Sequence, residues 1–306
     1  MKCMSINSTD WEDQRAFLAV LHEGSLSGAA RALGVAQPTV RRRLEALERA
    51  LGMALFTRSP GGLSPTDAAR ELAPHAQTMA SAADAFGRAA SGRPGDMAGT
   101  VRISASDVLG VEVLPAMLAT LRAAHSRLAL ELSLTNRNED LLRHEADIAV
   151  RMARPTQMAI VATRVGVVSL GLFARRDYLT RHGTPASLAD LRRFAMIGPD
   201  RASVDLRLMR DWGLDVRPSD MALRTDNHLA QLAAIRGGLG IGVCQQALAA
   251  RDASLVSVLS EAFHPGLETW VTMHEDLRRM QRVRATFAHL VEHLTAYCAG
   301  DRPAAT

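Results

Sequence analysis

The chain has 306 residues and a mass of 33.0 kDa, enough for one small domain and one larger one, or for three small ones. Hydrophobic residues make up 47% of it and charged residues 22%, a balance typical of folded globular proteins rather than disordered ones. The net charge of +4 indicates an acidic partner only if the basic residues gather in one region of the chain.

Cysteine usage and hydropathy bear on the compartment. Cys3, Cys244 and Cys298 are far apart and odd in number, so they indicate neither a disulfide framework nor a CxxC metal site. The stretch MKCMSINSTDWEDQ turns acidic where a secretory signal needs an apolar run, and no segment reaches the roughly 18 uninterrupted apolar residues of a membrane span. We therefore expect a soluble, cytoplasmic protein with no membrane partner.

Residues 10–66 have the pattern of short helices joined by sharp turns. Gly24 is suited to end the first helix, and Ser27 is the expected N-cap of the second, which Gly34 ends. Pro38 suits the first turn of a third helix, which stops at Gly52. One face of this third helix is apolar, at spacings of four, three and four: Val40, Leu44, Leu47 and Leu51.

Three consecutive arginines lie in the third helix, within the stretch AQPTVRRRLEALE. Successive helical residues are about 100° apart, so Arg42 faces away from Val40, and Arg41 and Arg43 lie on the flanks. On a lone helix, such a group is usually a solvated basic face.

The context of these arginines points to a helix-turn-helix instead. A helix, the Gly34 turn and a second helix preceded by Gln37 are the parts of this motif, which inserts its second helix into the major groove of DNA. Gln37 and Thr39 can then reach base edges, while the arginines bind phosphates or guanine.

Residues 66–93 form an alanine-rich segment with the periodicity of one long helix. Its apolar positions have near-heptad spacing: Leu72, Met79, Ala83, Phe86 and Ala90. Such a stripe is poorly buried by one chain, so we expect this helix to form a homodimer. Pro74 costs about 3 kcal/mol inside a helix, which predicts a kink there or a break near the start of the helix. Glycine and proline in residues 91–100 indicate a linker.

From Thr100 onward, strand and helix patterns alternate, which indicates a largely parallel α/β sheet. The first expected elements are a strand at 101–106, a helix at 114–125, a strand at 128–134, a helix at 138–146 and a strand at 147–152. The alternation resumes after about residue 168, so two α/β lobes are expected. A helix from about Arg278 to Ala299 closes the chain and is expected to return to the first lobe.

The first part of the chain shares a dense set of residues with one known family. They are Gly24, Ser25, Leu26, Ser27, Ala29, Ala30, Leu33, Gln37, Pro38, Val40, Leu44, Leu47, Glu48, Leu51, Gly52, Leu55, Phe56, Arg58, Leu63 and Thr66. With these residues the sequence resembles the LysR-type transcriptional regulators, and its length and two-lobed remainder also match. Three features depart from the family: Arg41 replaces a common serine, Ala69 a common glycine, and GVCQQ at 242–246 a common proline-containing turn.

The resemblance implies an α/β protein with an N-terminal all-α winged helix-turn-helix and a two-lobed effector-binding domain that resembles periplasmic solute-binding proteins. The expected bounds are 1–66 for the DNA-binding domain, 67–94 for the dimerising linker helix, and 95–306 for the effector-binding domain, with lobes at about 100–168 plus 268–300 and at 169–267. It also implies that two dimers can pair into a tetramer.

The segment from Leu55 to Thr66 is the expected wing, although an ordinary hairpin loop has the same pattern. In a wing, Arg58 and the backbone near Gly61 and Gly62 can meet phosphate or the minor groove. The candidate DNA-binding residues are therefore Ser27, Gln37, Pro38, Thr39, Arg41, Arg42, Arg43, Arg58 and Thr66.

Ser104, Ser106 and Asp107 lie at the carboxyl end of the first α/β strand, where open α/β sheets bind ligands. A plain strand end with a serine cap has the same pattern, and the family resemblance favours the ligand site. Arg151 could pair with an organic acid, or it could balance Asp107 internally. The candidate effector-binding residues are Ser104, Ser106, Asn136, Arg151, Thr225 and Asn227.

Three short stretches resemble enzyme motifs without completing them. HLVEH at 289–293 fits a zinc pattern, but Asp301 is the only later acid that could supply a third ligand. GVVSLG at 166–171 has one residue too many before Ser169 for a nucleophile elbow. GGLGIG at 237–242 leads from a helix into a strand, the reverse of a dinucleotide fingerprint. We therefore predict no enzyme, no metal and no cofactor.

The sequence thus predicts a sequence-specific DNA-binding transcriptional regulator that responds to a small-molecule effector. Its expected partners are double-stranded DNA, the effector and further copies of itself. The alternative is an enzyme or a solute-binding module with a DNA-binding appendage. Incomplete catalytic motifs argue against an enzyme, and the lack of a secretory signal argues against a periplasmic binding protein.

Overall fold

The computed structural model describes residues 10–59, 61–91, 95–136, 145–155, 160–215 and 217–300. The chain divides into a smaller unit, formed mainly by the residues up to Gly87, and a larger unit that begins at Arg88. Each unit has a hydrophobic core of its own.

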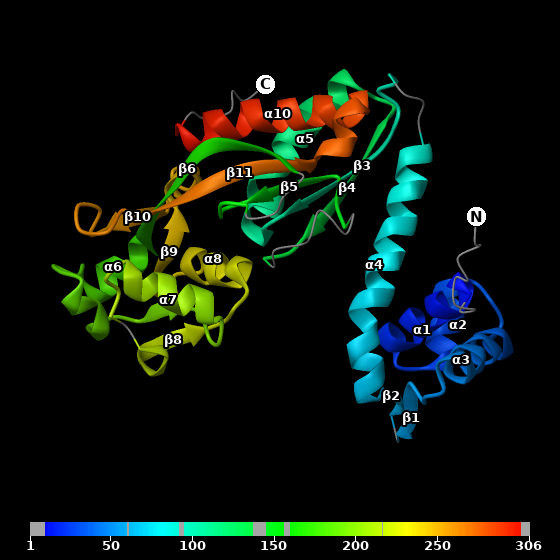
Figure 1. Cartoon of the computed structure of the whole chain (residues 1–306). Coiled ribbons are helices and arrows are strands. Elements are labelled where there is room, and N and C mark those ends of the chain that lie inside the picture. Colours follow the sequence, from blue (N-terminus) through cyan, green and yellow to red (C-terminus); the bar gives the residue numbers. More distant parts are fainter. Residues whose placement is uncertain are drawn as a thin grey trace. The chain divides into compact units, whose positions relative to one another are not determined.

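Three short helices form the body of the smaller unit (Figure 1). They are α1 (Trp11–Glu23), α2 (Leu26–Leu33) and α3 (Gln37–Leu51). Gly24, Gly34 and Gly52 end them in left-handed conformations, as the sequence predicts. The apolar faces of the helices meet in one core, which buries Phe17 and Val40 almost completely.

The second helix begins earlier than the sequence predicts. Ser25 is its N-cap, and the prediction of Ser27 is wrong: the Ser25 hydroxyl oxygen accepts a hydrogen bond from the Gly28 N–H at 3.1 Å. Ser27 lies in the first turn with its side chain exposed. Two serines precede the alanines of this helix, and the extended backbone and side-chain hydrogen bond of Ser25 identify it as the cap.

A short antiparallel hairpin follows α3, built from β1 (Phe56–Ser59) and β2 (Gly62–Pro65). Gly62 has a φ of 129°, and a β-carbon there would lie 2.5 Å from the carbonyl oxygen of Gly24. The same carbonyl accepts a hydrogen bond from the Leu63 N–H at 2.8 Å. Glycine at position 62 therefore lets the hairpin dock closely on the turn between α1 and α2.

The long helix α4 (Asp67–Ala90) is continuous through Pro74, so the expected alternative of a break near its start is wrong. Thr66 caps this helix, because its hydroxyl oxygen accepts a hydrogen bond from the Ala69 N–H at 3.2 Å. The same hydroxyl donates to the carbonyl of Ala54 at 3.0 Å. Thr66 thus joins the end of the hairpin to the start of α4.

One mixed sheet runs through the larger unit (Figure 1). Its strands are β3 (Gly99–Ala105), β4 (Leu128–Leu134), β5 (Ile148–Arg151), β6 (Ile160–Arg175), β7 (Met196–Gly198), β8 (Met221–Arg224), β9 (Ile241–Gln245), β10 (Leu255–Val258) and β11 (Gly266–His274). The spatial order is β4-β3-β5-β11-β6-β9-β7-β8, and β10 pairs with β6 beside this path.

The expectation of a largely parallel sheet needs correction. β3 is parallel to β4 and β5, and β7 is parallel to β8 and β9. By contrast, β6 is antiparallel to β9, β10 and β11, and β11 is antiparallel to β5. β6 is 16 residues long and extends from one lobe into the other, while β11 returns beside it. Because β6 and β11 both connect the lobes and run in opposite directions, the middle of the sheet is antiparallel.

Helices cover both lobes (Figure 1). The lobe of β3, β4 and β5 carries η1 (Leu109–Val113), α5 (Leu114–Ala124), η5 (Glu275–Arg279) and α10 (Gln281–Cys298). The lobe of β7, β8 and β9 carries α6 (Arg176–His182), η3 (Ala189–Arg193), α7 (Ser203–Asp211), η4 (Pro218–Asp220), α8 (His228–Arg236) and α9 (Gln246–Ala249). The last helix, α10, packs against α5 and β3 of the first lobe. The helix expected at 138–146 falls almost wholly outside the described residues.

The last turn of α4 belongs to the larger unit and is held there by a buried ion pair. Arg88 Nε lies 3.1 Å from Asp147 Oδ2, and both side chains are more than nine-tenths buried. The same carboxylate oxygen accepts a hydrogen bond from the Arg102 N–H at 2.8 Å, and Arg282 donates to the Arg88 carbonyl at 2.8 Å. Removing one partner from a buried ion pair is strongly destabilising, because the remaining charge loses its closest counter-charge in a site that excludes water.

We expect Asp147→Ala to lower the free energy of unfolding of the larger unit by about 3 kcal/mol, because the Arg88 guanidinium would lose its buried carboxylate. Glu268→Ala removes the half-exposed partner of Arg164 and should cost less than about 1 kcal/mol. Urea titrations followed by circular dichroism measure both changes. Equal losses for the two variants would contradict the role of the buried pair.

Candidate functional site

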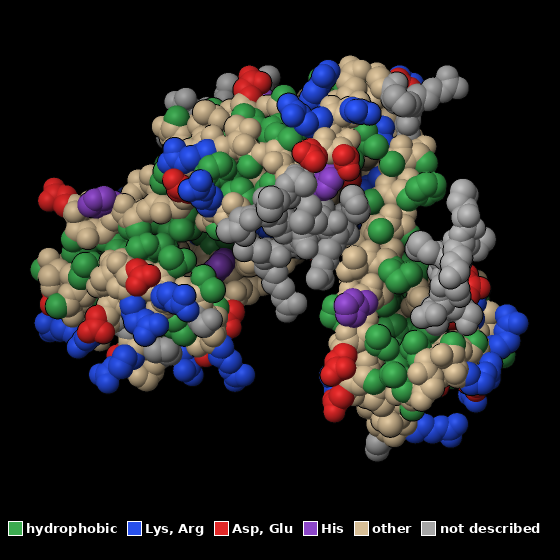
Figure 2. Space-filling model, viewed as in Figure 1, with side chains coloured by type: hydrophobic (Ala, Val, Ile, Leu, Met, Phe, Trp, Pro, Cys, Tyr) green, Lys and Arg blue, Asp and Glu red, His purple; other side chains and the backbone are tan. Residues whose placement is uncertain are grey.

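The exposed face of α3 forms an open groove on the smaller unit. It is lined by Gln37, Pro38, Arg41, Arg42 and Glu45. Val40, on the other side of the helix, is fully buried, so α3 has the orientation that the sequence predicts. Figure 2 shows basic side chains over the edge of this unit where α3 lies.

Arg43 differs from the neighbouring arginines in its surroundings. Its Nη1 lies 2.9 Å from Oε2 of Glu12 on α1, and its side chain is mostly covered. Glu12 also pairs with Arg15 at 2.8 Å. Arg43 therefore holds α3 against α1, and its contact with DNA stays a prediction.

The other predicted DNA-binding residues lie on α2, α3 and the hairpin. Arg58 on β1 is exposed, as is Ser27 in the first turn of α2, and Thr39 in α3 is partly buried. The Thr66 hydroxyl is engaged in capping α4. Their contacts with DNA remain predictions.

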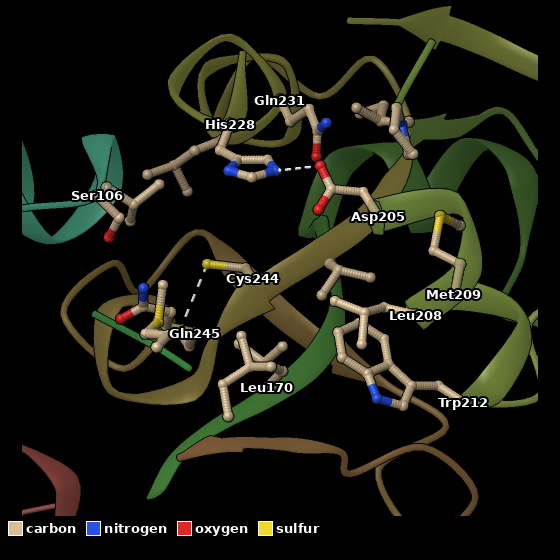
Figure 3. A pocket seen from close by; sticks show the side chains of 18 residues that line it. Ser106, Leu170, Asp205, Leu208, Met209, Trp212, His228, Gln231, Cys244 and Gln245 are labelled. Atoms are coloured by element: carbon tan, nitrogen blue, oxygen red, sulfur yellow. Dashed lines mark hydrogen bonds and ion pairs between the residues drawn. The ribbon is translucent and has the colours of Figure 1, made fainter. Parts of the chain in front are cut away.

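A cavity of about 140 Å³ lies between the lobes of the larger unit, at the carboxyl ends of β3 and β7 (Figure 3). Apolar side chains dominate its lining, among them Leu170, Leu208, Met209 and Trp212. The polar side chains of the lining are Ser106, Asp205, His228, Gln231 and Gln245. An apolar cavity with a few polar groups is the usual form of a small-molecule site.

Ser106 is the predicted effector residue that lines this cavity. It directly follows β3 and is 8% exposed. Its Oγ has no hydrogen-bond partner among the described residues. Because buried hydroxyl groups are normally hydrogen-bonded, this one is available to a ligand.

The remaining predicted effector residues lie outside the lining of the cavity, so far as the chain is described. Arg151 Nη2 donates to Ser104 Oγ at 2.7 Å. Thr225 Oγ1 accepts a hydrogen bond from the Asn227 N–H at 3.2 Å, and Asn227 Oδ1 caps α8 by accepting from the Ala230 N–H at 2.9 Å. These side chains support the strand ends rather than facing the cavity.

A polar chain that includes Asn136 joins the two lobes beside the cavity. Asn136 Nδ2 donates to Asp107 Oδ2 at 3.0 Å, and its Oδ1 accepts from the Asp107 N–H at 3.1 Å. The same amide nitrogen lies 3.4 Å from Nδ1 of His228, whose Nε2 lies 2.9 Å from Asp205 Oδ2 (Figure 3). The hydrogen bond with Asp205 raises the pKa of His228, against the opposing effect of burial.

The sequence pattern does not predict Asp205, Trp212 and His228 as lining residues. The spacing of the sequence could have indicated Asp205 and Trp212, because with Leu208 and Met209 they fall on one face of a helix. His228 comes directly after the predicted Asn227. Its place beside Asp205 depends on the packing of α7 against α8, which no local pattern shows.

The histidines of HLVEH take part in the packing of α10. His289 Nε2 lies 2.8 Å from the carbonyl oxygen of Met117, and His293 Nδ1 lies 2.9 Å from the carbonyl oxygen of His289. No cluster of three or more potential metal-ligating side chains occurs in the described part of the chain. No helix within the same ranges is long and apolar enough to cross a membrane.

Comparison with known proteins identifies the family. Residues 11–70 match the bacterial regulatory helix-turn-helix protein, lysR family, and residues 94–295 match the LysR substrate binding domain. The chain belongs to the LysR family of transcriptional regulators. The predicted class of function is thereby confirmed: a LysR-type regulator that binds DNA and responds to a small molecule, rather than an enzyme.

Similar proteins support this assignment. A probable hydrogen peroxide-inducible genes activator from Mycobacterium avium is 33% identical over 256 residues, covering 78% of this chain and 79% of that protein. The full-length virulence activator AphB from Vibrio cholerae is 20% identical with a TM-score of 0.61, covering 94% of this LysR-type chain and 99% of its own. Full-length CbnR complexed with its target DNA is 19% identical with a TM-score of 0.65, covering 93% and 99%. At these identities, the two structures support the fold.

The stability of the larger unit of this LysR-type regulator should fall as the pH rises through the raised pKa of His228. Asp205 stabilises the charged imidazole, with smaller contributions from Asp107 and Asp226. The stabilisation is therefore fully present below about pH 6.5 and is lost above the raised value. His228→Gln should flatten this part of the profile. Thermal unfolding between about pH 6 and pH 9 measures it, and parallel profiles for both proteins would exclude His228 as the cause.

Proposed function

We propose that the chain regulates transcription as a homodimer that reads duplex DNA with the exposed face of α3 and with the β1–β2 hairpin. The observation that carries this proposal is the common exposed face of Gln37, Arg41 and Arg42, on a helix whose opposite face is buried. A helix-turn-helix inserts such a face into the major groove, where amide and guanidinium groups read base edges.

The charge state of this face supports the same proposal. Arg41, Arg42 and Arg58 have no ion-pair partner among the described residues, whereas Arg43 is paired with Glu12. Exposed cations of this kind are available to phosphate oxygens and to guanine. CbnR, whose fold is similar, has been crystallised with its target DNA.

Arg42→Ala should weaken binding of the preferred DNA by roughly 1–3 kcal/mol if Arg42 reads a base. If Arg42 meets phosphate instead, all sequences should weaken alike and the dependence on salt should become shallower. The measurement is fluorescence anisotropy with DNA fragments that the purified protein retains from a random pool.

Arg207→Ala is the matched control, because Arg207 is exposed on α7 in the larger unit and its removal changes the net charge equally. It should leave the affinity unchanged. Unaltered affinity of Arg42→Ala for every fragment would exclude Arg42 from the DNA interface.

The proposed dimer rests on an apolar face of α4. Met79 is 45% exposed and Phe86 77% exposed, and they are seven positions apart, so both lie on one side of the helix. Figure 2 shows apolar side chains at intervals along α4. Leu72, at the start of the predicted stripe, packs into the core of the smaller unit instead. A second copy that presents the same face would cover both exposed side chains, and pairing of two such dimers would give a tetramer.

Phe86→Asp should raise the dissociation constant of the dimer at least about tenfold, because it places a charge in an apolar contact. Gln77→Asp is the control, since Gln77 is exposed and lies nine residues earlier, on the opposite side of the helix. Light scattering at micromolar concentrations measures both variants. A parent protein that is folded and monomeric would refute the dimer.

The cavity between the lobes is the proposed effector site. Ser106 gives it a buried hydroxyl group without an internal partner among the described residues, and both lobes contribute to its lining. A ligand there contacts both lobes, so it can favour one arrangement of them over another. Binding should then change the affinity for DNA while leaving the ligand chemically unaltered.

A cysteine-based peroxide sensor, which the name of the Mycobacterium avium relative suggests, is less well supported. Burial raises the pKa of the Cys244 thiol to about 11, which disfavours the reactive thiolate. Cys244 on β9 lies opposite Gly171 of β6 in the sheet, whereas Cys298 packs against Gly166 of the same strand β6. The two thiols are therefore roughly 15 Å apart along the strand, too far for a disulfide without rearrangement. Cys3 lies outside the described residues.

The cytoplasm is the proposed location, because a DNA-binding regulator meets its operator there. The helix-turn-helix family match supports this location.

A further inference from the structure

The lining of the cavity is poor in positive charge. Within the described ranges, no lysine or arginine lines it, and Asp205 is its carboxylate. His228 is the one lining side chain there that can become cationic, and Asp205 already pairs with it at 2.9 Å. A carboxylate ligand would therefore enter a site whose charged pair is already balanced.

The arginine that could attract an acid is used elsewhere. Arg151 donates to Ser104 and to the carbonyl of Val150, and it does not line the cavity. Asp107 and Asp226 act on His228 from neighbouring segments, and both add negative potential. An acidic ligand would meet repulsion from these carboxylates without a compensating guanidinium group.

The helix ends beside the cavity are also occupied. Asp226 accepts hydrogen bonds from the N–H groups that lead into α7, those of Asp200, Arg201 and Ala202. Asn227 caps α8, and Asn136 accepts the hydrogen bond of the Asp107 N–H. N–H groups at helix starts commonly bind anions, and here internal side chains already hold them.

The rest of the cavity suits a ring. Trp212, Leu208 and Met209 form an apolar wall on α7 and its end, and Leu170 adds to it from β6 (Figure 3). The volume of about 140 Å³ is close to that of an engineered apolar cavity of about 150 Å³ that accepts benzene. The cavity therefore matches a molecule with one ring.

We propose that the effector is an uncharged molecule with a single ring and a hydroxyl or N–H group at one end, rather than an organic acid. This inference rests on the proposed function, since it names the ligand class of the same cavity. The free hydroxyl of Ser106 can donate to the ligand or accept from it. Asp205 Oδ1, which has no partner among the described residues, accepts from the ligand. A carboxylate has no hydrogen to donate to Asp205, whereas a hydroxyl group has one.

Three probes of the same ring and different charge test the proposal: benzyl alcohol, benzoate and benzylamine. Isothermal titration of the full chain at about pH 7.5 measures their dissociation constants. Benzyl alcohol should bind at least about tenfold more tightly than benzoate, because one missing hydrogen bond in a buried site costs about that factor. Benzoate or benzylamine binding as tightly as the alcohol would overturn the assignment of an uncharged ligand.

Variants locate the binding and test its cause. Ser106→Ala should weaken benzyl alcohol about tenfold, whereas Ser257→Ala, exposed on β10, should not change it. Asp205→Asn keeps the shape of the side chain and removes its charge, so the preference for the alcohol over benzoate should shrink. A preference that Asp205→Asn leaves unchanged would exclude Asp205 as the source of the selectivity.

The outcomes separate this inference from the proposed function. Benzoate binding that depends on Ser106 would leave the cavity as the effector site and refute only the ligand class. If Ser106→Ala changes the binding of none of the three probes, both the ligand class and the location of the effector site are refuted.

Discussion

The antiparallel crossing of β6 and β11 is the constraint on which the larger unit depends. Each lobe contributes a parallel group of strands, and the 16-residue β6 joins one group to the other while β11 returns beside it. The strand β3 ends at Ala105 in one lobe and β7 ends at Gly198 in the other, and the residues that follow them, Ser106 and Pro199, line one cavity. The position of the site therefore follows from the topology, as it does in other open α/β sheets. Its chemistry follows from a few side chains that the topology brings together.

Polar contacts across the junction hold the lobes in the arrangement described. Arg236 of α8 forms a two-point ion pair with Glu112 of η1, at 2.7 and 2.9 Å, and this pairing lowers the pKa of Glu112. Tyr297 of α10 donates to Oε1 of Gln245, which lines the cavity. A ligand can shift such an arrangement only through its different affinity for the alternatives. Gln245 therefore links the lining of the cavity to α10 through one hydrogen bond.

The smaller unit could be predicted almost completely from sequence, because its signals are local. Glycine stops, an apolar stripe and an early proline fix the helices, and the misplaced cap at Ser27 is an error of two residues. In the larger unit, the sequence predicts the helices and strands but not the antiparallel direction of the central strands. The pairing of β6 depends on β11, about a hundred residues away in sequence. In the site, Ser106 could be found because it follows a strand. The sequence could not show whether Arg151 faces a ligand or an internal partner, because its partner Ser104 lies 47 positions away.

A series of contacts links the end of α4 to the strand that precedes Ser106. Asp147, which holds Arg88 in the last turn of α4, directly precedes β5, and Arg151 ends that strand. Arg151 bonds to Ser104 of β3, the strand that ends at Ala105, directly before Ser106. Buried pairs of this kind do not stretch gradually, because close packing leaves them few alternative positions. A displacement of β3 relative to β5 would therefore have to break the bond between Arg151 and Ser104 or move both strands together, and β5 directly follows Asp147, whose carboxylate holds the end of α4.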